Sequence, residues 1–190
     1  MRSPVQLRAA RDTDAPALVD IWSQVIRRGE RPQQVEEVRH VVDRVSGMPE
    51  EQIVVAEVEG RVVGAVHLRT TTYSPINLEP VVQVASPHVL PEFRRHGIGS
   101  ALLQSAVDFA EAHGIAHVGV AVAAGARESN RFMARLSLGP AATLRVATTS
   151  TVKNRLLAAH RPMLARGGVR PLTQVMAARR SLRRKQPSEG

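Results

Sequence analysis

The chain has 190 residues, of which 43% are hydrophobic, 23% charged and 3% aromatic, a composition typical of one globular domain with an aliphatic core. Its net charge of +9 lies in residues 153–190, where ten basic residues stand against one Glu, whereas residues 1–152 are neutral. The absence of cysteine excludes a disulfide framework, a cysteine-ligated zinc site and a thiol nucleophile.

The N-terminal part of the chain predicts one strand and two helices. The weak alternation of polar and apolar residues over Val5–Arg8 indicates a first strand. Asp12 is a typical N-cap residue, and apolar residues at helical spacing follow it up to Gly29. A second helix is expected over Gln33–Val45, where valines recur on one side.

Three strands are expected in the middle of the chain, over Gln52–Val58, Arg61–Thr71 and Val81–Leu90. Glu59-Gly60 joins the first two strands as a hairpin turn, because Gly permits the positive φ that such a turn needs. Pro87 lies inside the third strand and has no N–H for the ladder, so a bulge or a splayed pairing is expected there.

The segment after the third of these strands is the most informative for chemistry. A turn with Arg94, Arg95, Gly97 and Gly99 leads into a long apolar helix that ends at Gly114. The first N–H groups of a helix have no partner within it, and the helix dipole adds partial positive charge there. Glycines remove the side chains that would keep an anion away, so the turn predicts a phosphate or pyrophosphate site. The spacing matches neither the Walker pattern nor the dinucleotide G-x-G-x-x-G.

The last third of the domain predicts a strand over His117–Ala124, a short helix over Arg127–Leu136 and a final strand over Leu144–Thr151. Strands and helices therefore alternate irregularly along the chain, which indicates a mixed α/β fold.

The Gly-rich turn resembles motif A of the GNAT N-acetyltransferase superfamily, in which Arg/Gln-x-x-Gly-x-Gly/Ala follows a strand that ends in Val-x-Pro. The matching run is Val89-Leu90-Pro91-Glu92-Phe93-Arg94-Arg95-His96-Gly97-Ile98-Gly99-Ser100-Ala101-Leu102-Leu103. The resemblance implies a central, mostly antiparallel sheet with a splayed parallel pair and flanking helices. It implies an acyl-CoA-binding domain over residues 1–152, followed by a basic extension over residues 153–190.

The same resemblance implies acetyl-CoA as the acyl donor and no metal. The backbone of one run would hold the pyrophosphate, and its residues are Arg94, Arg95, His96, Gly97, Ile98, Gly99 and Ser100. The backbone of Val89 would contact the thioester carbonyl and polarise it. Asn130 would replace an asparagine that the family carries near its second motif.

That second motif, Phe-Tyr-x-x-x-Gly-Phe, is altered in this chain. Met133 takes the place of the Tyr whose hydroxyl is the usual general acid of the family, and Ser137 and Leu138 replace the last Gly and Phe. Methionine cannot donate a proton, so water or another group would have to protonate the departing CoA thiolate.

Three residues are candidates for proton transfer. His88, in the strand expected over Val81–Leu90, and Glu79, at the start of that strand, are candidates for the base that takes the amine proton. Tyr73 is the candidate acid if its loop folds over the site. Side chains alternate along a strand, so His88 and Val89 lie on opposite faces unless Pro87 disrupts the pleat. The alternatives are a structural role for His88 and an ordinary loop position for Tyr73.

The predicted function is transfer of an acetyl group from acetyl-CoA to an amine by direct attack in a ternary complex. A non-catalytic acyl-CoA-binding regulatory module is one alternative, motivated by Met133. A nucleic-acid-associated protein that binds through its basic tail is another. The tail predicts helices over Val152–Arg166 and Pro171–Arg184, which either stay solvated or contact an acidic partner.

The expected partners are acetyl-CoA and an amine, with a homodimer left open. Residues 1–8 contain no apolar signal segment, and no later run is long and apolar enough to span a membrane. The sequence therefore predicts a cytoplasmic protein.

Overall fold

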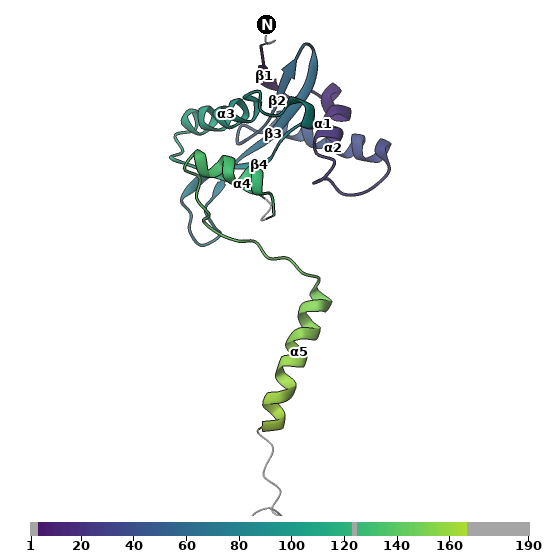
Figure 1. Ribbon diagram of the computed structural model, residues 1–190, viewed down its shortest axis with the longest axis vertical. Helices are drawn as coiled ribbons and strands as arrows, with labels where there is room; N and C mark the ends of the chain where they lie inside the picture. Colours follow the sequence, from purple (N-terminus) through teal and green to yellow (C-terminus); the bar gives the residue numbers. More distant parts are fainter. Residues whose placement is uncertain (1–3, 123–124, 167–190) are drawn as a thin grey trace, which may run out of the picture. The chain divides into compact units, whose positions relative to one another are not determined.

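A single sheet of five strands organises the first part of the chain (Figure 1). The computed structural model describes residues 4–122 and 125–166. In sheet order the strands are β1 (Gln6–Ala9), β2 (Glu51–Val58), β3 (Arg61–Thr72), β4 (Pro80–Val89) and β5 (His117–Val120). The first four strands pair antiparallel, and β4 pairs with β5 in parallel. This mixed sheet with flanking helices confirms the expected fold class.

Helices cover both faces of the sheet (Figure 1). α1 (Ala15–Ile21) and α2 (Arg31–Ser46) pack on one face, and α3 (Ile98–Ala112) packs on the other. Neighbouring strand residues therefore enter different cores: Val54 belongs to the α3 side and Val55 to the α1–α2 side, and both are buried. Burial on both faces is the reason that each of β2 and β3 contains an uninterrupted apolar run, at 53–56 and 62–66.

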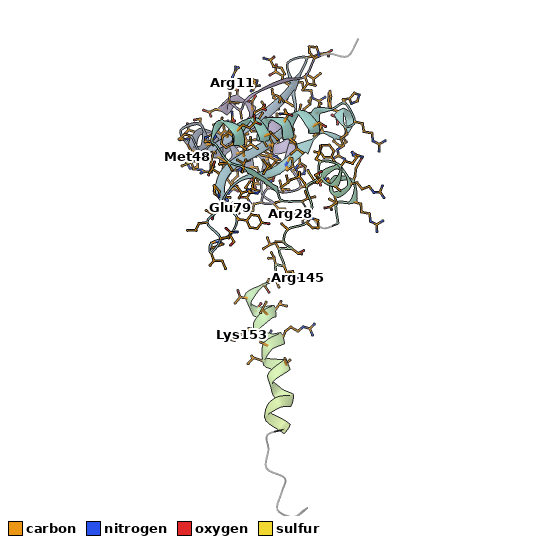
Figure 2. All side chains as sticks on the ribbon, turned by 90° about the vertical axis from the view of Figure 1, so that its left-hand side faces the viewer. Arg11, Arg28, Met48, Glu79, Arg145 and Lys153 are labelled. Carbon is orange, nitrogen blue, oxygen red and sulfur yellow. The ribbon has the colours of Figure 1, made fainter. Side chains whose placement is uncertain are left out.

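The chain divides into two compact units, Met1–Ala141 and Ala142–Gly190. The first contains the sheet, α1 to α3 and the short α4 (Arg127–Arg135). The second contains α5 (Thr149–Arg166), which confirms the helix expected over Val152–Arg166. The described side chains of α5 are exposed, among them Lys153, which is labelled in Figure 2.

The final strand expected over Leu144–Thr151 is wrong. Within the described residues no strand follows β5, and α5 begins inside the expected segment. Leu144 and Val146 are 90% and 85% exposed, so the apolar pattern there meets no partner strand. A short alternating run forms a strand only where a neighbouring strand supplies the ladder hydrogen bonds, and the pattern alone does not show that neighbour.

Two other expectations reach residues that the structure does not describe. β5 ends at Val120, before the expected end at Ala124, and residues 123 and 124 lie outside the described part of the chain. The helix expected over Pro171–Arg184 also lies outside it. Within residues 4–122 and 125–166, no helix is both long and apolar enough to cross a bilayer.

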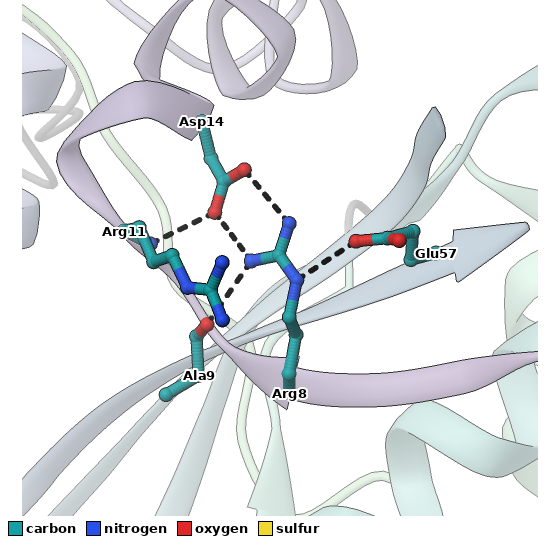
Figure 3. A network of polar contacts seen from close by, with 5 residues as sticks. All are labelled: Arg8, Ala9, Arg11, Asp14 and Glu57. Atoms are coloured by element: carbon teal, nitrogen blue, oxygen red, sulfur yellow. Dashed lines mark hydrogen bonds and ion pairs between the residues drawn. The ribbon is translucent and has the colours of Figure 1, made fainter. Parts of the chain in front are cut away.

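An ion-pair network joins β1, β2 and the start of α1 (Figure 3). Arg8 of β1 donates to both carboxylate oxygens of Asp14, at 2.6 and 3.0 Å, and its Nε donates to Glu57 of β2 at 2.8 Å. The Arg11 N–H donates a further bond to Asp14 at 2.8 Å. Asp14 is only 7% exposed, so the network satisfies a carboxylate that has almost lost its contact with water.

Candidate functional site

β4 and β5 diverge halfway along β4. Their ladder runs from the pair of Val81 with His117 to the pair of Val84 with Val120. The Ala121 N–H makes one more bond to the Val84 carbonyl at 3.3 Å. From there to Val89, β4 is paired with β3 alone. The parallel pair is therefore splayed, and the backbone on the open side of β4 has no strand partner.

A bulge lies in the splayed part of β4. One residue of β3, Val66, faces two residues of β4, Ser86 and Pro87. Ser86 has a φ of +48°, an uncommon conformation for a residue with a side chain. The bulge agrees with the irregularity expected at Pro87. Beyond it, Val89 lies on the α3 face of the sheet and His88 on the α1–α2 face.

The backbone of Val89 points to the open side of β4. The Leu90 N–H donates to the Val63 carbonyl at 2.9 Å. Because hydrogen-bonded and non-hydrogen-bonded pairs alternate in an antiparallel ladder, the adjacent pair of Gly64 and Val89 is non-hydrogen-bonded. The Val89 N–H is therefore directed away from β3, and the Val89 carbonyl accepts a bond from Arg94 Nε at 3.1 Å.

The Gly-rich turn ends in a set of free backbone donors. Arg95 and Gly97 have φ values of +63° and +83°, and Gly97 is the N-cap of α3. The Ala101 N–H makes the first helical bond, to the Gly97 carbonyl at 3.0 Å. The N–H groups that precede this bond belong to Ile98, Gly99 and Ser100. A Cβ atom built on Gly97 meets nothing within 4 Å, so the space beside this turn is open to an anion.

α4 lies beside this turn. The Arg95 guanidinium is 3.5 Å from the Glu128 carboxylate, and both side chains are largely exposed. A Cβ built on Gly99 would be 3.8 Å from two ring atoms of Phe132, an ordinary contact distance. His96 is exposed in the turn itself. The rim of the turn is therefore formed by two arginines, His96 and the first half of α4.

The two α4 residues that the family motif singles out lie in different surroundings. Asn130 is exposed, and its side-chain amide donates to the Ala126 carbonyl at 3.0 Å. Met133 is 7% exposed and belongs to the core on the α3 side of the sheet. Met133, which the resemblance aligns with the family's tyrosine, is therefore a packing residue of this core.

His88 has an uncommitted ring nitrogen. Its Nδ1 is buried and has no hydrogen-bond partner among the described residues. Buried polar atoms are nearly always paired, so an unpaired imidazole nitrogen next to the splayed backbone is a functional candidate. Neutral imidazole carries one nitrogen that can accept a proton.

The other two proton-transfer candidates lie at the opposite end of β4. The Tyr73 N–H bonds to the Glu79 carbonyl at 2.9 Å and closes the β3–β4 loop, while the Glu79 carboxylate contacts His117 Nδ1 at 3.3 Å. Both Glu79 and His117 are about half exposed, and Glu79 is labelled in Figure 2. At about 3.3 Å per residue, β4 separates Glu79 from Val89 by roughly 30 Å. The hairpin therefore carries Tyr73 and Glu79 away from the Gly-rich turn.

Gly64 is a site residue that sequence reasoning missed. A Cβ atom on Gly64 would be 3.1 Å from the His88 carbonyl, 3.2 Å from Ile98 Cγ2 and 3.3 Å from Leu102 Cδ1. The missing side chain lets the first turn of α3 approach the end of β4. No local pattern signals this, because Gly64 lies inside an otherwise apolar strand.

We expect Gly64→Ala to lower the free energy of unfolding by about 1–3 kcal/mol, because three tight contacts must yield in a packed core. Urea denaturation would measure the change. Gly119→Ala in β5 is the matched control, because its Cβ would meet Val81 at 3.4 Å, an ordinary contact. Equal losses in the two variants would show that the first turn of α3 moves freely.

Other features lie away from the turn. A hollow of about 410 Å³ lies between the C-terminal turns of α2 and α3 and the start of β2, with His113 and Glu51 in its wall. Within the described ranges, no three His, Asp or Glu side chains gather as metal ligands would. The splayed end of β4 and the N-terminus of α3 are therefore the candidate site.

Known proteins share this sequence pattern and fold. The profile of the acetyltransferase (GNAT) family matches residues 18–138. An uncharacterized N-acetyltransferase of Archaeoglobus fulgidus is 38% identical over 58 residues, which are 30% of this chain and 40% of that protein. A transcriptional regulator from Bacillus halodurans C-125 has a TM-score of 0.66 at 20% identity, over 76% of this chain and 100% of its own.

A second solved structure, of the aminoglycoside N-acetyltransferase AAC(6')-Iy in complex with CoA, has a TM-score of 0.66 at 14% identity. The match covers 78% of this chain and 97% of that one. At identities of 20% and 14%, the similarity of this chain to each of the two solved structures shows a common fold.

Proposed function

This chain belongs to the GNAT family of acetyltransferases, and from that premise we propose that it transfers an acetyl group from acetyl-CoA to an amine. The observation that carries the proposal is the free donor set at the N-terminus of α3, which lies directly after the splayed end of β4. The acceptor is proposed only as a class, a neutral amine.

The residues of the turn fit the pyrophosphate of acetyl-CoA. The N–H groups of Ile98, Gly99 and Ser100 supply donors together with the positive end of the α3 dipole. The space beside Gly97 is open, and Arg95 adds positive charge at the rim. A solved relative by fold was crystallised with CoA, which supports this choice of ligand.

The splayed strand supplies the groups for the chemistry. The Val89 N–H, directed to the open side of β4, would donate to the thioester carbonyl and stabilise the negative charge that develops on it. Acetyl-CoA supplies the acyl group: the amine nitrogen forms a bond to the carbonyl carbon, the C–S bond breaks, and CoA leaves as a thiolate that takes a proton from water. His88, half-buried at the splayed end of β4, would accept the amine proton on its imidazole, directly or through one water.

Two measurements test the proposal. Calorimetry would detect acetyl-CoA binding, and a thiol reagent would detect CoA release over a panel of amines. The chain contains no cysteine, so the released CoA is the only thiol in that assay. Binding followed by amine-dependent CoA release is expected. Binding without release over a broad panel would favour a non-catalytic acyl-CoA module, and no binding by folded protein would overturn the proposal.

We expect His88→Ala to lower kcat about a hundredfold, the typical contribution of a general base, and to leave the KM for acetyl-CoA nearly unchanged. Steady-state kinetics with each substrate varied in turn would separate the two effects. Added imidazole should restore part of the activity of this variant. His40→Ala, an exposed position on α2, is the control that should keep full activity. Unchanged kcat in His88→Ala would remove His88 from the reaction.

A further inference from the structure

We propose that Trp22 is a positioning residue for acetyl transfer: its indole N–H holds the β4 bulge that decides which of His88 and Val89 faces the α1–α2 side of the sheet. The inference rests on the function proposed above. Its first step, the bond between Trp22 and the bulge, can be tested without any activity.

The contact joins two distant parts of the chain. Trp22 Nε1 donates to the Ser86 carbonyl at 2.9 Å, across 64 positions of sequence. Trp22 follows α1 directly and is 7% exposed, in the same core as Leu18 and Ala65. The indole is therefore fixed by packing on the α1–α2 side, and its N–H donates to one carbonyl of β4.

That carbonyl belongs to the residue whose backbone is unusual. Ser86 has a φ of +48° and is one of the two residues that face a single residue of β3. A bulge removes regular ladder bonds, and a partly buried carbonyl without a partner is unfavourable. The indole N–H is the partner of that carbonyl, so it stabilises the bulged form of β4 relative to a regular strand.

The bulge determines the faces of the residues after it. In the structure, Gly64 on the α3 face pairs with Val89, and paired residues share a face. Without the extra residue, the ladder would advance by one position and pair Gly64 with His88. His88 would then lie on the α3 face and Val89 on the α1–α2 face. The two residues that the proposed reaction uses would therefore exchange faces of the sheet.

This arrangement predicts a kinetic signature. The donors that hold acetyl-CoA lie at the N-terminus of α3, on residues that Trp22 does not contact through its indole N–H. Loss of the indole bond should therefore lower kcat more than it weakens acetyl-CoA binding. We expect Trp22→Phe, which keeps an aromatic ring but removes the N–H, to lower kcat about tenfold, the effect of one hydrogen bond. The dissociation constant of acetyl-CoA should stay within about twofold.

A second substitution separates positioning from stability. Ser86→Gly removes the strain of the positive φ, because glycine adopts it freely, and so favours the bulge without help from the indole. In the Trp22→Phe background, Ser86→Gly should restore most of the lost kcat. Val42→Ala, a buried truncation in the same core, should lower stability but leave kcat unchanged.

The closing experiment uses the fact that the chain has one tryptophan, so its indole N–H gives a single NMR resonance. Slow exchange of this proton with solvent is expected in the wild type. Fast exchange would overturn the proposal whatever the activity, as would Trp22→Phe with unchanged kcat in an active enzyme. If the wild type shows a protected indole but transfers acetyl to no amine, the function proposed above fails and the positioning role fails with it, while the bond to the bulge stands.

Discussion

Gly99→Glu is expected to weaken acetyl-CoA binding at least about a thousandfold, roughly 4 kcal/mol, because it places a carboxylate among the donors proposed to hold the pyrophosphate. Gly99 is the second residue of α3, and its N–H precedes the first helical hydrogen bond. Calorimetric titration of acetyl-CoA into the variant and the wild type would measure the difference.

This substitution separates binding from folding. A Cβ on Gly99 makes only ordinary contacts, at 3.8 Å from the Phe132 ring, so the site accepts a side chain without a clash. Glutamate is also favourable in the first turn of a helix, both in propensity and in its interaction with the dipole. The variant should therefore unfold at a temperature no lower than the wild type while it loses its ligand.

Gly99→Gln is the matched control, because it adds a side chain of the same size without the charge. It should lose no more than about tenfold in affinity if repulsion between anions is the dominant effect. Equal losses in the Glu and Gln variants would point to steric obstruction alone. Unchanged affinity in the Glu variant would place the pyrophosphate elsewhere.

Arg8→Met is expected to lower the free energy of unfolding by about 3 kcal/mol, because it leaves a nearly buried carboxylate without its partner. Arg8 makes two bonds to Asp14 and one to Glu57, which tie β1 to α1 and β2 (Figure 3). Chemical denaturation near neutral pH would measure the loss.

The same network makes stability depend on pH in a defined direction. Burial raises the pKa of Asp14, but the bonds from Arg8 and from the Arg11 N–H outweigh burial and hold this pKa below its ordinary value. The unfolded chain, with an Asp pKa of about 3.9, therefore binds the proton more readily than the folded one. The contribution of Asp14 is present above about pH 4 and is lost as the pH falls through the folded pKa. Below about pH 4 the wild type should lose stability more steeply than Arg8→Met.

Arg27→Met is the control for this experiment. It breaks the ion pair of Arg27 with Glu37, whose side chains are 70% and 46% exposed. The free energy of unfolding should change by no more than about 0.5 kcal/mol, as is usual for surface pairs. If the two methionine variants lost the same stability, the burial of Asp14 would have no energetic consequence.

Features that depend on a few consecutive residues could be predicted from the sequence. Glu59 and Gly60 have φ values of +50° and +77°, as the expected hairpin turn requires. Pro87 signalled the irregularity in β4, and the helix that follows Gly97 begins one residue after it. Such signals are readable because turn chemistry and helical periodicity are local.

Local patterns do not determine features that depend on a partner far along the chain. The alternating pattern of Leu144–Thr151 resembles a strand, but no neighbour in the described part of the chain pairs with it. Tyr73 and Glu79 were reasonable candidates for proton transfer by residue type, and the hairpin carries them to the far end of β4.

The sequence by itself determined the family, the order of most elements and the donor-rich turn at the start of α3. Only the tertiary structure decided which face of the sheet carries His88 and which carries Val89, because a shift of one position in strand register exchanges them. That register depends on Gly64, which pairs with Val89 from another strand, and on the contact of Trp22 with Ser86 across 64 positions. Residue patterns describe neighbours along the chain, whereas register and close approach arise from residues that only folding brings together.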